Sequence, residues 1–123
     1  MAAPNILNAT SIYGKTIGAA LGTTVTTTIL TCPTDKVLRI KSIIAANIDN
    51  SNTSSDVTVI FRDSSAGTDY RMANTVTVPG KTTLVISSSD SSIFLEESDE
   101  IRAGASTTGD IELIISYEEL DDA

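Results

Sequence analysis

Short runs in which aliphatic and Ser or Thr side chains alternate fill much of this 123-residue sequence and limit what it can fold into. Val57, Val59 and Phe61, for example, recur at every second position. The same spacing recurs near the end of the chain, at Ile111, Leu113, Ile115 and Tyr117. A period of two places such side chains on one face of a strand, and turn-forming clusters separate the runs about every 8–12 residues. The pattern predicts an all-β protein.

About eight strands are predicted, at residues 24–30, 36–48, 56–63, 68–78, 82–87, 93–95, 100–106 and 111–119. In the second of these, alternation breaks at residues 43–46, which indicates a bulge or a strand buried on both faces. In the fourth, Val76 and Val78 are expected to point inward. Pro79 and Gly80 then fit the second and third positions of a type II turn. We expect one antiparallel β-sandwich or jelly-roll-like domain; the sequence leaves jelly-roll and immunoglobulin-like topologies open.

The predicted domain covers residues 23–123 and ends in a short acidic tail at 118–123. Residues 1–22 are harder to assign, because Gly14, Gly18 and Gly22 interrupt a polar segment. We interpret them as an extended N-terminal arm with one short strand around residues 10–13. Such an arm suits lying across a neighbouring subunit. No strand–helix–strand rhythm or internal repeat is present, which argues against an α/β nucleotide-binding fold.

Charge and residue inventory exclude several classes of function. The chain has 8 basic and 16 acidic residues, a net charge of −8, which argues against nucleic acid as a partner. It has no His, the common general base and metal ligand, and its one Cys excludes an intrachain disulfide or a multi-cysteine metal site. No run approaches the ~20 apolar residues of a membrane helix, and the start does not resemble a signal peptide. We expect no enzyme activity, cofactor, membrane contact or small-molecule substrate.

The candidate chemical groups each have a simpler structural interpretation. Cys32 lacks a His partner, so a small, partly buried hydrophobe is expected rather than a nucleophile. A Ser–Lys dyad is formally available, but no Ser lies in a G-x-S-x-G or S-x-x-K motif. Two segments offer calcium-type oxygen ligands without matching the known calcium loop, and we favour solvated turn carboxylates at both. These segments are the loop at residues 49–56 and the cluster Glu96, Glu97, Asp99 and Glu100.

Two further features bear on assembly. Lys36, Arg39 and Lys41 form a small basic group that is expected to make a rim of salt bridges or to meet an acidic neighbouring subunit. The Thr-rich residues 23–31 carry few charges. An edge strand without charged guards is open to pairing with another chain, so this segment predicts a subunit contact.

Three segments resemble elements of small virion structural proteins of tailed bacteriophages, of the marine cyanobacterial type. Asn8-Ala9-Thr10-Ser11-Ile12-Tyr13-Gly14-Lys15-Thr16 is similar to their N-x-T-x-I-x-G-K-T opening. Phe94-Leu95-Glu96-Glu97-Ser98-Asp99-Glu100-Ile101-Arg102 resembles F-x-L-E-E-G-D-x-I-R, with Ser98 in place of Gly. Ser116-Tyr117-Glu118-Glu119 resembles their S-Y-E-E ending, so the resemblance spans nearly the whole chain.

The resemblance implies a multicopy, non-enzymatic protein of the phage particle. A capsid decoration protein on the head surface, in contact with copies of itself and the major capsid protein, is the first expectation. A neck, tail or fibre-attachment component is the alternative. A carbohydrate-binding sandwich ranks third, because sugar sites favour aromatic platforms and the chain has no Trp and only Tyr13, Tyr70 and Tyr117.

Overall fold

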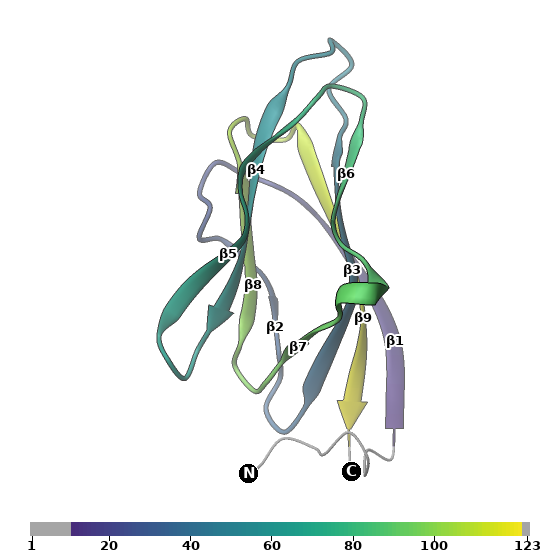
Figure 1. Ribbon diagram of the computed structural model, residues 1–123, viewed down its shortest axis with the longest axis vertical. Helices are drawn as coiled ribbons and strands as arrows, with labels where there is room; N and C mark the ends of the chain where they lie inside the picture. The colour runs from purple at the N-terminus through teal and green to yellow at the C-terminus, as the bar shows by residue number, and fades with distance from the viewer. Residues whose placement is uncertain (1–10, 122–123) are drawn as a thin grey trace.

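The computed structural model describes residues 11–121, which form two antiparallel β-sheets packed face to face (Figure 1). One sheet has the order β1-β9-β3-β6, with β7 also paired to β3, and the other has the order β2-β8-β4-β5. The first contains β1 (Ser11–Ala20), β9 (Ile111–Asp121), β3 (Val37–Asn47), β6 (Thr83–Ser87) and β7 (Ile93–Leu95). The second contains β2 (Thr28–Thr31), β8 (Glu100–Ala105), β4 (Ser55–Asp63) and β5 (Thr68–Val78). The predicted all-β sandwich is confirmed.

The connectivity is that of a jelly roll. The three-residue β7 is an extra strand, and without it eight main strands remain. Counted in chain order, the first, eighth, third and sixth form one sheet, and the second, seventh, fourth and fifth form the other. This is the strand order of a double-sheet jelly roll. The topology that the sequence left open is therefore resolved.

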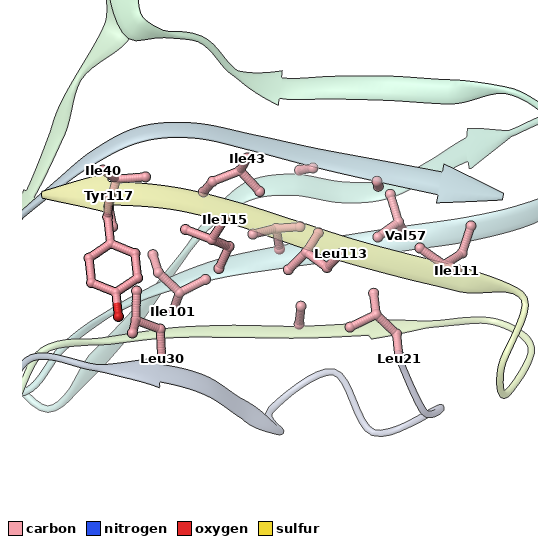
Figure 2. Packing of buried hydrophobic residues seen from close by; sticks show 14 of the residues in the cluster. Leu21, Leu30, Ile40, Ile43, Val57, Ile101, Ile111, Leu113, Ile115 and Tyr117 are labelled. Carbon is pink, nitrogen blue, oxygen red and sulfur yellow. The ribbon is translucent and has the colours of Figure 1, made fainter. Parts of the chain in front are cut away.

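The core lies between the sheets and is almost entirely aliphatic. Figure 2 shows Leu113, Ile115 and Ile111 of β9 directed toward the opposite sheet, where Ile101 and Leu30 also lie. The predicted period of two in β9 is confirmed, since the four residues Ile111, Leu113, Ile115 and Tyr117 are all buried.

The irregularity predicted at residues 43–46 corresponds to a bulge in β3 that lies slightly earlier in the strand. Its pairing with β9 shifts register between Ile40 and Ser42. The buried positions change from even to odd across this shift, with Ile40 before it and Ile43 after it both fully buried. The extra residue keeps both halves of the strand facing the core.

The N-terminal segment differs most from expectation. Only a short strand around residues 10–13 is predicted, yet β1 runs over Ser11–Ala20 and pairs with β9 along its whole length. Most β1 side chains are exposed on both faces, so the strand has no alternating apolar pattern to reveal it. Residues 1–10 lie outside the described residues, and so does the start of the N-x-T-x-I-x-G-K-T motif.

Three smaller predictions need correction. The strand predicted at 24–30 is only Thr28–Thr31, because a turn occupies residues 25–26. The last strand, predicted to end at residue 119, continues through residues 120–121 of the predicted acidic tail, and residues 122–123 lie outside the described part of the chain. Val78 is buried as expected, but Val76 is 37% exposed, because the pairing of β4 with β5 shifts register and Thr75 adopts a positive φ of 52°.

The turn after β5 is displaced by one residue from the predicted position. Its hydrogen bond runs from the Thr82 amide to the Pro79 carbonyl, and Lys81, not Gly80, has the positive φ, 63°. Gly80 is required for a different reason. A Cβ atom there would lie 2.4 Å from the Cα of Asn52, so the loop before β4 can approach only a glycine.

Candidate functional site

Cys32 is a structural residue of the core. Its side chain is 1% exposed, and the thiol lies 3.2 Å from the carbonyl oxygen of Lys36, to which it donates. Burial raises the pKa of the Cys32 thiol to about 11, so the reactive thiolate is scarce at neutral pH. The expectation of a small buried hydrophobe is confirmed.

In the acidic turn before β8, Glu96 is exposed as predicted, but Asp99 is a buried structural bracket and not a solvated carboxylate. Asp99 is 6% exposed, and its two oxygens accept hydrogen bonds from the backbone amides of Ser64 and Glu96, each at 3.0 Å. Glu97 accepts from the Asp35 amide at 3.2 Å. These bonds tie together the turns before β8, between β4 and β5, and before β3. Across residues 11–121, no three His, Cys, Asp or Glu side chains are grouped so that they could hold a metal ion.

The predicted rim of salt bridges forms in part along the end of β9, through Lys36 and Arg39 but, among the described residues, not through Lys41. Lys36 pairs with Asp121, and this hydrogen bond raises the pKa of Lys36. Arg39 lies 3.4 Å from Glu118. Sequence reasoning missed a third pair, in which the Lys15 ammonium lies 3.3 Å from the carboxylate of Glu119. Glu119 lies where the predicted last strand (111–119) and the predicted acidic tail (118–123) overlap, and only the β1–β9 register reveals its partner.

A second ionic cluster lies on the four-stranded sheet. Arg102 bonds Glu100 at 2.9 Å and lies 3.6 Å from Asp69, which also accepts from Arg62. The hydrogen bond from Thr28 is the main cause of the lowered pKa of Glu100, and the hydrogen bond from Arg102 is the next largest. The cluster links β2, β8, β4 and β5 across the sheet, and its Arg102–Glu100 bond lies within β8.

The outer face of the five-stranded sheet carries an apolar row. The register places Val85, Ile44, Ile114 and Gly18 side by side on four adjacent strands, β6, β3, β9 and β1. Val85 is 60% exposed and Ile114 is 38% exposed, although hydrophobic side chains of this size usually gain by burial. A shallow hollow of about 320 Å³ adjoins the row over the ends of β1 and β9. This outer row is the candidate contact surface.

The tyrosines do not form a shared platform. Tyr117 is 8% exposed and belongs to the core. Tyr13 lies on β1, whereas Tyr70 lies on β5 of the other sheet and stacks on Phe61 with ring centroids 6.3 Å apart. The two exposed rings are thus presented by different sheets, which is unfavourable for stacking on one sugar.

Two comparisons with known proteins found no match, so a function is proposed from the sequence and the fold. No family model matches the chain. A search of curated proteins likewise found no match. The residues described contain no helix long and apolar enough to cross a membrane.

Proposed function

We propose that this chain is a non-enzymatic structural protein of a tailed-bacteriophage particle, carried in many copies as a decoration protein on the head shell. The observation that carries the proposal is the jelly-roll strand order. Double-sheet jelly rolls recur in viral capsid domains, an analogy of fold that supports assembly without itself assigning a role. The three motif-like segments of the sequence point the same way.

The outer row supplies a surface for the major capsid protein. Val85 and Ile114 are exposed on a sheet whose other face is the core. No segment of residues 11–121 covers them, so contact with another chain could bury them. An apolar centre with a polar rim is the usual composition of a stable protein contact. The ion pairs of Arg39 and Lys36 lie toward the other end of the same sheet.

Quantitative mass spectrometry of purified phage particles tests the placement. We expect tens to hundreds of copies per particle if the protein decorates the head, because shells are built from many equivalent sites. A copy number of a few to about a dozen would instead support a neck, tail or fibre-attachment component. Absence from the particle would refute the proposal.

Binding of the purified protein to undecorated heads tests the surface. Val85→Glu places a charge in the outer row, and we expect binding at least tenfold weaker, because burying an unpaired carboxylate is costly. Val76→Glu is the matched control, since Val76 is a half-exposed valine on the opposite sheet. Equal losses from both variants would refute the outer row as the contact.

A sugar-binding role is the competing hypothesis, because jelly rolls also occur among lectins. A glycan array separates the two. Clear hits that are lost in Tyr70→Ala would support the lectin, whereas the proposed role predicts no hits.

A further inference from the structure

The first strand, β1, presents an edge that the rest of the fold does not protect. It is ten residues long, and within residues 11–121 only β9 pairs with it. As far as the described residues go, its outward edge therefore offers a row of free backbone amide and carbonyl groups, which is a template for another strand. Lys15 is the single charged residue in the strand, and its ammonium is held by Glu119 of β9.

The other edges of the sandwich carry the features that prevent such pairing. β2 has four residues and a bulge in its pairing with β8. β5 carries charged side chains and the positive φ of Thr75, which distorts its line. β6 and β7 share the remaining edge, with five and three residues. Short, charged or irregular edges resist pairing, so the contrast singles out β1 rather than the segment 23–31 that the sequence favoured.

We propose that β1 pairs antiparallel with β1 of a second copy of this chain, about a twofold axis at Thr16, so that two five-stranded sheets become one. The inference names the self-contact within the proposed assembly role and rests on that role for its biological meaning. A twofold contact uses the same surface on both copies, as is usual for homodimers.

Charge and length together select this register. Directly opposite residues of an antiparallel pair have their side chains on the same face of the sheet. The twofold axis must therefore set one residue opposite its own copy, not opposite the copy of a sequence neighbour. The middle of the ten-residue strand lies between Lys15 and Thr16. An axis at Lys15 would set the two lysines directly opposite each other, which is unfavourable. An axis at Thr16 keeps a nine-residue overlap over residues 12–20 and places Lys15 opposite the partner's Ile17.

The glycines make this seam flat and accessible. In the proposed register, Gly14 lies opposite the partner's Gly18 on the outer face of the sheet. A Cβ atom added at Gly14 would meet no atom within 4 Å, and one at Gly18 would meet only the Leu113 carbonyl at 3.8 Å. Neither glycine has a positive φ. Packing within one copy therefore does not require them, and both positions accept test side chains.

Paired charges at these two glycines test the register. We expect Gly14→Lys/Gly18→Glu to dimerise at least tenfold more tightly than Gly14→Lys/Gly18→Lys, because the first sets unlike charges opposite and the second sets like charges opposite. The control is stringent. The double-lysine variant has the smaller net negative charge, so general repulsion alone predicts the reverse order. Sedimentation equilibrium measures both, with circular dichroism to verify folding.

Cross-linking supplies an independent test on the full chain. Thr16→Cys places a thiol at the proposed axis, and a short bismaleimide is expected to link two copies. Thr83→Cys on β6, at the opposite edge of the same sheet, is expected not to be linked. Cys32 stays silent because it is buried.

A strictly monomeric protein at its highest soluble concentration, equal linking at both cysteines, or the reverse order of the charged variants would each overturn the inference. A monomer would leave the particle role intact, because mass spectrometry of particles decides that separately. Conversely, a dimer of the proposed register with no protein on the particle would refute the function and leave the contact standing.

Discussion

Gly104 of β8 offers the sharpest test of the packing between the sandwich and the segment that leads into β2. A Cβ atom at Gly104 would lie 2.7 Å from the Cα of Val25 and 2.8 Å from the carbonyl oxygen of Thr24. Both obstacles are backbone atoms. Hydrogen bonds from the Ala103 and Ala105 amides to the Thr27 and Gly22 carbonyls hold that backbone in place on either side. Residues 22–27 therefore cannot move away from Gly104 without breaking these hydrogen bonds.

Gly104→Ala is expected to destabilise the protein by about 2–3 kcal/mol, the upper part of the range for overpacking, because no side chain can rotate away. For a domain of this size the melting temperature falls by roughly 8–15 °C. Urea unfolding followed by far-ultraviolet circular dichroism gives the free energy directly. Gly14→Ala is the matched control, since its added methyl meets no atom within 4 Å. Equal stability of the two variants would show that the close approach at Gly104 is not real.

Four other expectations follow from single residues. Asp99→Ala should cost about 2–4 kcal/mol in urea unfolding, since two backbone amides lose their acceptor; an unchanged midpoint would contradict the bracket. Cys32 should react with iodoacetamide at neutral pH only after urea unfolds the chain, because burial raises its pKa to about 11; rapid labelling of the native protein would contradict this. Ser98→Gly should stabilise by up to about 1 kcal/mol, since Ser98 holds a φ of 72°, and lower stability would show that its side chain matters. The lowered pKa of Glu100 contributes stability that is present above its ordinary pKa of 4.5 and lost as the pH falls through the lowered value. Glu100→Gln should flatten that part of the stability profile, and an unaltered profile would refute the assignment.

The sequence predicted elements well wherever one face is buried. β4 and β9 were located from the period of two, and the bulge of β3 from the break in that period. Local turn statistics were less successful. They placed Gly80 at the positive-φ position, whereas its absent side chain matters for a long-range approach to Asn52. No local pattern encodes a contact with a loop that lies nearly 30 residues away.

The sequence indicated which charged side chains matter, but not which residues they contact. Lys36 and Arg39 form salt bridges as expected, yet their partners, Asp121 and Glu118, lie in the segment predicted as the acidic tail. Asp99 was predicted to be solvated and is buried, because its backbone partners come from two different turns. In each case the missing information is which strands are neighbours, and a jelly roll brings together residues from opposite ends of the sequence.

The failure to predict β1 and the proposal that it forms a contact have the same physical origin. A strand is recognised in a sequence by the side chains that it buries, and β1 buries few, with only Ile17 of its large side chains packed against the core. Within one copy, β1 is held by its ladder to β9, by the Lys15–Glu119 pair and by the Thr16–Ser116 hydroxyl contact. A part-exposed ion pair and an exposed hydroxyl contact of this kind each contribute little. Pairing along the free edge would give hydrogen-bond partners to the backbone groups of β1 that point away from β9. In a monomer, β1 should therefore exchange its amide hydrogens faster than β9. As the protein concentration rises, β1 should become protected from exchange. Protection that does not depend on concentration would mean that the edge is already satisfied within a single chain.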